Sequence, residues 1–208
     1  MNTRKKPSDD FCLESPDKRT IYISIPKNAS SFVSDWLTEN GWTTRRIGST
    51  DPTYVMVILR DPADRWISGI AQYLESLWIT ADQITEGLDK VLFDIVDGFD
   101  DHTWPQHIYF EGVHPKKSRI WFHTDLDLMT SIGTRFRLEL PKTENFNKKD
   151  QQRRDIADYL KQRMTDPILF RKIQEKFQRD HDIISRADFT QFGPPSLGHF
   201  SPLPRNDQ

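Results

Sequence analysis

The stretch IPKNASSF, residues 25–32, places one lysine and two serines between an apolar run and an amphipathic segment. The apolar run, residues 21–25, is rich in β-branched side chains, which predicts a buried strand. From about Ser31 onward, apolar residues recur at helical spacing, so a helix is expected there. The N–H groups at the start of a helix attract anions, and Lys27 adds a full positive charge. The pattern therefore indicates a site for a small anion such as a phosphate group.

This loop lacks the glycines of an ATP or GTP P-loop. That motif, G-x-x-x-x-G-K-[ST], needs its glycines so that the backbone can wrap around two phosphates. In this chain the loop is shorter, and Lys27 precedes the serines. A plainer interpretation also stays open, in which Ser30 or Ser31 caps an ordinary helix and Lys27 is a solvated charge.

A second segment, LRDPADRWIS, follows the apolar run of residues 54–59, which predicts another buried strand. Asp61 and Pro62 are typical of a helix cap and first helical position. The planar guanidinium group of Arg60 can bind two oxygens of a phosphate monoester, and the hydroxyl of Ser68 could contact the same phosphate. The alternative is that Arg60 pairs with a nearby aspartate and Ser68 is a small packing residue.

Together, the two segments resemble the nucleotide site of sulfotransferases that use 3'-phosphoadenosine 5'-phosphosulfate (PAPS), and most closely that of the Golgi carbohydrate sulfotransferases. The family motifs are P-K-x-[AG]-[SC]-[ST] for the 5'-phosphosulfate and R-D-P-x-x-R-x-x-S for the 3'-phosphate, and the chain matches both in order. The resemblance implies that Arg60 and Ser68 hold the 3'-phosphate. The residues that it assigns to the 5' group are Lys27, Asn28, Ala29, Ser30 and Ser31.

Later segments resemble the family more faintly, and the similarity covers roughly residues 20–190. DDHTWPQHIYF is similar to a D-x-H-W-x-P-Q stretch, with the tryptophan displaced by one residue. RIWFHTDLDLM is similar to a strand that leads to a short acidic turn. FRKIQEKFQRDHDIIS is similar to a late helix with Y-x-x-D-x-x-x-[FL], although phenylalanine replaces the tyrosine.

Transfer of a sulfuryl group to an alcohol needs an in-line acceptor oxygen, stabilisation of the developing charge and a base for the hydroxyl proton. We expect Lys27 to stabilise the bridging oxygen. We favour His102 as the base, because its ordinary pKa lies near neutrality and Asp101 could orient it. A purely structural role for the histidine is the alternative. The remaining candidates for the base are Asp101, His107 and Glu111.

No metal is expected, since sulfuryl transfer does not require one. The histidines lack the spacing of a helical metal site; they are His102, His107, His114 and His123. A basic run is expected to be a solvated helix face unless the acceptor is acidic; its members are Lys148, Lys149, Arg153 and Arg154.

The composition limits the class of protein. The formal net charge of −2 and pI near 6.3 give no global basic field, so nucleic acid is not expected as a partner. The single cysteine, Cys12, excludes an intramolecular disulfide and fits a reducing compartment. No apolar run follows the N-terminus, so neither a signal peptide nor a membrane anchor is expected. The expectation is a cytoplasmic enzyme, bacterial or viral, unless the chain is a trimmed catalytic domain of a Golgi enzyme.

Alternating strands and helices predict one α/β domain, a P-loop-NTPase-like three-layer fold with a mostly parallel central sheet flanked by helices. The expected division is a flexible N-terminal segment at 1–19, the sulfotransferase domain at 20–190 and a Pro/Gly-rich tail at 191–208. Further predicted elements are helices at 62–78, 80–95, 150–164 and 166–179 and strands at 118–123 and 136–140.

Two competing functions stay open. A nucleotide-dependent phosphotransferase would need a carboxylate for Mg²⁺ and a lysine on a triphosphate, and the missing glycines count against it. A catalytically inactive nucleotide-binding module of the same fold is the other alternative. The joint presence of Lys27, Arg60 and Ser68 counts against that one.

Overall fold

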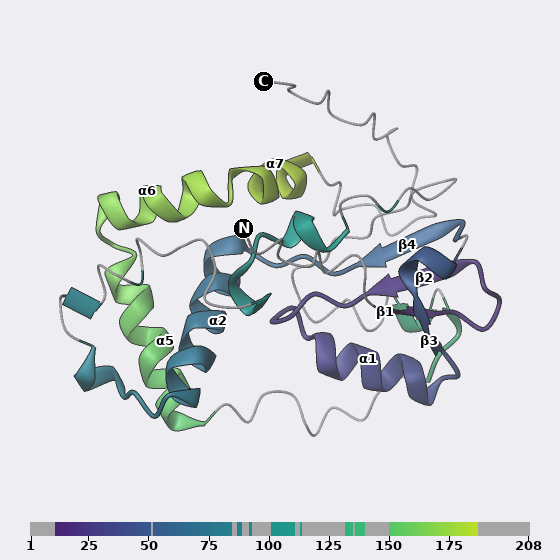
Figure 1. Ribbon diagram of the computed structural model, residues 1–208, viewed down its shortest axis with the longest axis horizontal. Helices are drawn as coiled ribbons and strands as arrows, with labels where there is room; N and C mark the ends of the chain where they lie inside the picture. Colours follow the sequence, from purple (N-terminus) through teal and green to yellow (C-terminus); the bar gives the residue numbers. More distant parts are fainter. Residues whose placement is uncertain are drawn as a thin grey trace, which may run out of the picture.

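The structure, a computed structural model, combines a four-stranded sheet with helices in a mixed α/β fold (Figure 1). The strands are β1 (Phe11–Glu14), β2 (Thr20–Ile23), β3 (Thr43–Arg46) and β4 (Tyr54–Val57). The structure describes residues 11–50, 52–84, 87–88, 92, 101–110, 113, 132–134, 136–139 and 150–186.

The sheet has the strand order β3-β1-β2-β4. β2 and β4 are parallel, with Ile23 opposite Val57, whereas β1 runs antiparallel to both β2 and β3. The expectation of a mostly parallel sheet is therefore wrong for the described strands. The cause is the short connection from β1 to β2, closed by a hydrogen bond from Ser15 N to Thr20 O (2.8 Å), because so short a link joins only antiparallel strands.

The N-terminal segment is part of this sheet. Residues 1–19 were expected to be flexible, but β1 lies between β2 and β3, and Cys12 and Leu13 are buried. That prediction is wrong for residues 11–14, while residues 1–10 and the predicted tail lie outside the described residues. The four residues FCLE are too few to show a periodic pattern, so only their pairing with two neighbours identifies them as a strand.

The two helices that follow the motifs form as predicted. α1 (Ser30–Glu39) ends before Gly41, whose φ of +84° is a conformation that glycine adopts without strain. α2 (Pro62–Ser76) begins at the expected Asp-Pro pair, and the Asp61 carboxylate accepts a hydrogen bond from Asp64 N (2.9 Å). Both helices therefore begin at the carboxyl ends of the parallel strands β2 and β4, where the polar motif residues also lie.

The two faces of the sheet are covered by different segments. On one face, Leu13, Tyr22 and Met56 pack against the buried side of α1. On the other face, Ile21 and Val55 belong to a cluster that includes side chains from residues 101–110 and from the C-terminal helix. In Figure 1, α1 lies below the sheet, while α6 and α7 run along the top of the molecule.

The C-terminal helices are α5 (Gln151–Arg163), α6 (Pro167–Lys176) and α7 (Gln178–Arg186). The helix predicted at 150–164 is confirmed. The helix predicted at 166–179 begins as expected, with the Asp166 carboxylate accepting from Ile168 N, but it ends at Lys176, and α7 begins as a separate helix at Gln178. Phe177, between the two helices, and Asp180 on α7 are both buried, each 1% exposed.

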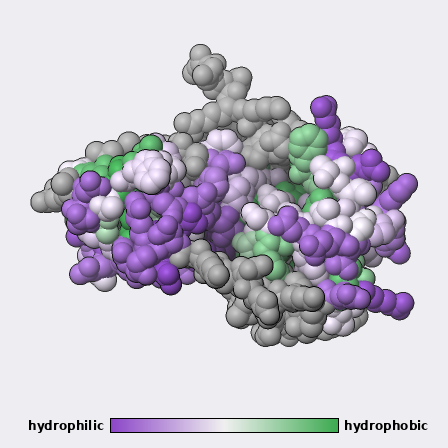
Figure 2. Space-filling model, turned by 90° about the horizontal axis from the view of Figure 1, so that it is seen from below, coloured by the Kyte–Doolittle hydropathy of each residue, from purple (hydrophilic) through white to green (hydrophobic). Residues whose placement is uncertain are grey.

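α5 packs beside α2, away from the sheet (Figure 1). Arg153 of the predicted basic run is not a free surface charge, because its Nε donates to Glu75 Oε2 on α2 (2.7 Å). The part of the molecule that contains α2 and α5 has a mostly hydrophilic surface when seen from below (Figure 2). Lys148 and Lys149 lie outside the described residues.

Two further predictions need correction. The capping box at Thr80 and Gln83 is present, but it begins a 3₁₀-helix, Ala81–Gln83, and the next residue, Ile84, is extended. The helix predicted at 80–95 therefore does not start there. The strand predicted at 136–140 is also wrong for residues 136–139, since Phe136 is helical and Glu139 O instead accepts from Trp36 Nε1 (2.7 Å). The strand predicted at 118–123 lies outside the described residues.

Within the described part of the chain, no helix is both long enough and apolar enough to cross a membrane.

Candidate functional site

The loop after β2 has an unusual backbone. Lys27 and Ala29 both adopt the left-handed region, with φ of +71° and +57°. Ala29 is the N-cap of α1 and contributes no side-chain hydrogen bond, so the interpretation of Ser30 or Ser31 as the cap is wrong. Non-glycine residues in this region cost of order 1 kcal/mol each, and such strain concentrates at functional sites. The glycine-free loop thus makes its sharp turn with strained residues in the positions where glycine would be relaxed.

Lys27 spans the space between this loop and α2. Its Nζ donates a hydrogen bond to Oε1 of Gln72, at 2.7 Å. Gln72 is partly exposed, so the ammonium group lies at the surface between the start of α1 and the middle of α2. The lysine is therefore placed beside the loop whose N–H groups open α1.

Arg60 lies just beyond β4 and contacts the same loop. Its Nη1 donates to the backbone O of Lys27, at 3.4 Å. Asp61, one alternative partner for this arginine, instead uses its carboxylate to cap α2. The structure therefore brings the two motifs together at one edge of the sheet. Ser68 is on α2 but is only 5% exposed, so little of its side chain is open to a ligand in this conformation.

An amide side chain that the sequence analysis did not single out connects these motifs. Oε1 of Gln106 accepts from Asn28 Nδ2 (2.6 Å) and from Arg60 N (3.0 Å), and its Nε2 donates to Arg60 O (2.8 Å). Asn28 Nδ2 also donates to Ile58 O (2.6 Å). Gln106 and Asn28 are 1% and 3% exposed. The Asn28 side chain therefore faces the protein interior.

Arg65, the second arginine of the RDPADR segment, is also buried. Its Nε donates to Pro26 O (2.9 Å), and its guanidinium further donates to the backbone oxygens of Trp104 and Asp101. Burial lowers the pKa of Arg65 from its ordinary value, while nearby Tyr109 opposes that shift. The guanidinium also lies over the Tyr109 ring, 5.7 Å from its centroid. Arg65 thus joins the loop after β2 to residues 101–104.

Two histidines form pairs with carboxylates. Nδ1 of His102 lies 3.1 Å from Asp101 Oδ1, as the proposed orienting role requires, and both side chains are partly exposed. Nδ1 of His107 lies 2.7 Å from Asp180 Oδ1, and Asp180 is 1% exposed. Nothing in the sequence identifies Asp180 as the partner of His107, although Asp180 lies in the late segment that resembles the family motif. Glu111 lies outside the described residues.

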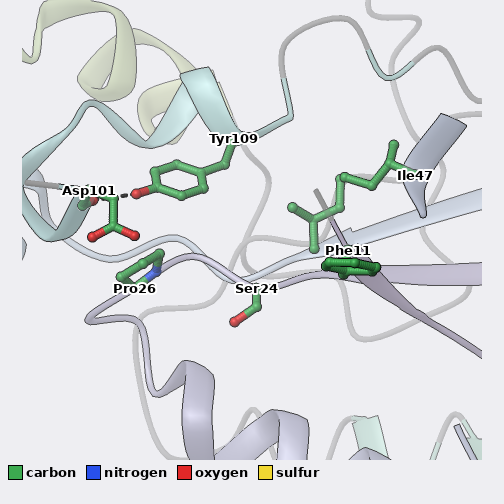
Figure 3. Close-up of a pocket in the computed structure, with 7 residues that line it drawn as sticks. Phe11, Ser24, Pro26, Ile47, Asp101 and Tyr109 are labelled. Carbon is green, nitrogen blue, oxygen red and sulfur yellow. Dashed lines mark hydrogen bonds between the residues drawn. The ribbon is translucent and has the colours of Figure 1, made fainter. Parts of the chain in front are cut away.

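A cavity of about 170 Å³ opens beyond the carboxyl end of β2 (Figure 3). Figure 3 shows Asp101 and Tyr109 on one side of it and Phe11 and Ile47 on the other, with Ser24 between them. Among the described residues, its lining has one carboxylate, two aromatic rings and no lysine or arginine. The lining residues are Phe11, Ile23, Ser24, Pro26, Ile47, Asp101 and Tyr109.

In the described ranges, no group of three or more histidine, cysteine, aspartate or glutamate residues is placed to hold a metal ion. His114 and His123 lie outside those ranges.

No protein-family model, curated protein or solved structure matches the chain.

Proposed function

We propose that this protein is a PAPS-dependent sulfotransferase with a P-loop-like fold, acting on a hydroxyl group of a carbohydrate. The observation that carries the proposal is the meeting of the two motif segments, where Arg60 Nη1 donates to Lys27 O. β2 and β4 are parallel neighbours, so the loops after them lie at the same edge of the sheet. Ligands of α/β proteins bind at that edge. One nucleotide could therefore contact both segments.

The proposed reaction is an in-line displacement at sulfur. The acceptor oxygen forms a bond to sulfur while the bond from sulfur to the bridging oxygen of the 5'-phosphate breaks, and 3'-phosphoadenosine 5'-phosphate (PAP) leaves. Negative charge grows on that bridging oxygen, and Lys27 is the cation placed to stabilise it. In our proposal, the hydroxyl proton goes to His102, which Asp101 orients.

The cavity beside the loop supplies space for an acceptor in this scheme. Asp101 lines it and also pairs with the proposed base His102. Carboxylates accept hydrogen bonds from hydroxyl groups, and the aromatic rings offer flat apolar surfaces to a sugar ring. The carboxylate disfavours a second negative charge in this space, so the proposal favours acceptors that carry no sulfate or carboxylate.

The proposal places the enzyme in a reducing compartment such as the cytoplasm, because the chain has a single cysteine. We propose no nucleic acid partner, since the net charge of −2 supplies no attraction for a polyanion.

The test is thermal unfolding with PAP, with adenosine 5'-phosphate, and with ATP plus Mg²⁺. At a hundred times its dissociation constant, a ligand stabilises a protein by about 2.7 kcal/mol, which raises the midpoint of a domain this size by roughly 5 to 10 °C. We expect this shift with PAP and a smaller one with adenosine 5'-phosphate. A shift with ATP plus Mg²⁺ alone would favour phosphoryl transfer. No shift with any of the three would overturn the proposal.

Arg60→Ala tests the assignment of the 3'-phosphate. The arginine is expected to contact only that group, so the variant should bind PAP and adenosine 5'-phosphate with nearly equal affinity, whereas the natural protein prefers PAP by at least about tenfold. Isothermal titration with both ligands measures the difference. An unchanged preference for PAP would remove Arg60 from the site. Arg171→Ala, an exposed arginine on α6, is the matched control.

A further inference from the structure

A buried polar network links α7 to the loop after β2. It begins at the Asp180 carboxylate, whose Oδ2 accepts from Gln106 N (2.6 Å) and whose Oδ1 accepts from His107 N (3.0 Å). The same Oδ1 lies 2.7 Å from His107 Nδ1. Asp180 is 1% exposed, and a buried carboxylate is stable only when it is well hydrogen-bonded. The carboxylate therefore fixes the backbone of residues 106 and 107.

The Gln106 side chain in turn forms hydrogen bonds to both motif segments. It contacts Asn28 once, through Nδ2, and Arg60 twice, through its backbone N and O. An amide side chain has two acceptor positions and two donor hydrogens. Gln106 uses both acceptor positions and one donor hydrogen in these three contacts. A side chain with only donors or only acceptors, such as lysine or an ionised glutamate, could not make all three.

The loop that Gln106 contacts through Asn28 is the loop with the strained backbone. Asn28 lies between Lys27 and Ala29, the two residues with left-handed backbones. Strained conformations persist only where surrounding contacts over-determine them. Apart from Gln106, the described contact of the Asn28 side chain is with Ile58 O, at the end of β4. Both contacts connect the loop to the segment that carries Arg60.

We propose that Gln106 and Asp180 are positioning residues that hold the Lys27 loop and Arg60 in the relative arrangement that binds the nucleotide. Asp180 acts through the backbone of Gln106, and Gln106 acts through its side chain on Asn28 and Arg60. The role in nucleotide binding rests on the proposed function. The effect on the loop conformation does not, so the two can be tested separately.

Gln106→Glu is the first test variant. It keeps the size and shape of the side chain, but an ionised carboxylate cannot donate to Arg60 O and places negative charge against that oxygen. We expect the variant to bind PAP at least about tenfold more weakly than the natural protein, at a temperature where circular dichroism shows both to be folded. Gln174→Glu makes the same change at an exposed position on α6 and serves as the control.

Asp180→Asn is the second test variant. It replaces one acceptor oxygen by an NH₂ group, so either Gln106 N or His107 N loses its partner. The expected result is a loss of PAP affinity in the same direction as for Gln106→Glu. Asp182→Asn removes the same charge from an exposed position two residues further along α7, and it should leave PAP affinity unchanged.

Amide hydrogen exchange of the unliganded protein separates this inference from the proposed function. With Gln106→Glu or Asp180→Asn, exchange at Asn28, Val33 and Arg60, whose N–H groups donate to Ile25 O, Ala29 O and Gln106 Oε1, should be at least about tenfold faster than with the two controls, without a matching increase in the strands. Exchange that changes only in step with global stability would overturn the positioning role and leave a purely structural one. Unchanged PAP affinity in both folded variants would overturn the link to the nucleotide.

If the natural protein does not bind PAP, the proposed function fails, while the exchange experiment still decides whether the network holds the loop. If Gln106→Glu does not fold, Asn28→Ala cuts the same link from the loop side and leaves the contacts of Asp180 in place. It should then show the same faster exchange at Val33, whose N–H donates to Ala29 O, and normal exchange there would contradict the proposal.

Discussion

At the scale of single residues, the main question concerns the charge on Lys27. Its Nζ donates to Gln72, a neutral amide. An ammonium group binds a charged acceptor more strongly than a neutral amide, so an anionic ligand would be a stronger partner for Lys27 than Gln72 is. The long, flexible side chain also suits a role in which the charge acts mainly as bonds break.

We predict that Lys27→Ala lowers kcat by about 100-fold or more while changing PAP affinity only a few-fold, because charge on the bridging oxygen develops only in the transition state. Initial rates with radiolabelled PAPS and titration with PAP measure the two effects. Lys161→Ala, an exposed lysine on α5, is the control and should change neither. Comparable losses in rate and PAP affinity would contradict the transition-state role.

At the scale of elements, the close approach of α2 to residues 101–103 positions the proposed base. Gly69 is the contact point, since a Cβ built there would lie 2.7 Å from His102 O and 3.0 Å from Thr103 Cγ2. Alanine normally stabilises a helix relative to glycine, by up to about 1 kcal/mol. At Gly69 the backbone of His102 and the side chain of Thr103 occupy the space, so alanine should destabilise the protein instead.

We therefore predict that Gly69→Ala lowers the free energy of unfolding by about 1 to 3 kcal/mol, since the clash must move α2 or the segment that holds His102. Chemical denaturation measures the change. Gly48→Ala is the matched control, because a Cβ there would meet nothing within 4 Å, and it should be neutral within about 0.5 kcal/mol. If Gly69→Ala stabilised the protein, residues 101–103 would have moved away from α2 at little cost in free energy.

The elements that could be predicted from sequence are those whose chemistry is local. α2 and α6 each begin with an aspartate cap followed by proline, and α1 ends before a glycine. β1 and β3 could not be predicted in the same way. All four residues of β3, TTRR, are exposed, and they form a strand only because β1 pairs with them. A four-residue edge strand gives no periodic signal of its own.

At the scale of the whole molecule, β1 pairs with β2 and β3 and so holds the start of the described chain in the core. The ionisation of the buried Cys12 thiol is a measure of this burial. Burial, and to a lesser extent Glu14, raises the pKa of the thiol from its ordinary value of 9.0 to about 11. The unfolded chain therefore loses the thiol proton at a lower pH than the folded protein does. Between these values the folded state binds more protons, so its stability falls as the pH rises.

We predict that the difference in free energy of unfolding between the natural protein and Cys12→Ala shrinks from pH 9 to pH 11, by at most about 1.4 kcal/mol per pH unit. Denaturation of both proteins across that range measures it, and the comparison cancels the titration of tyrosines and lysines. The thiol should also react slowly with a disulfide reagent at pH 8 unless the protein is unfolded. Rapid reaction in the folded protein would show that β1 detaches readily.

The sequence by itself determined the parts of the candidate site that depend on neighbouring residues. It indicated the strand-loop-helix around Lys27, the strand-cap-helix around Arg60 and the pairing of His102 with Asp101, and the structure contains all three. The sequence also shows directly that this loop contains no glycine. Caps, charges and apolar spacing are local properties, so they can be read over a few residues.

Only the tertiary structure decided how these parts are held together. Gln106 and Asn28 are 78 residues apart, and Gln106 and Asp180 are 74 apart, yet each pair shares a buried hydrogen bond. Nothing in the local sequence of any of these residues identifies its partner. The strand order, the antiparallel β1 and the break between α6 and α7 were also decided at this level. Such contacts form between whichever polar groups the packed chain buries together, because each of them must then find a partner.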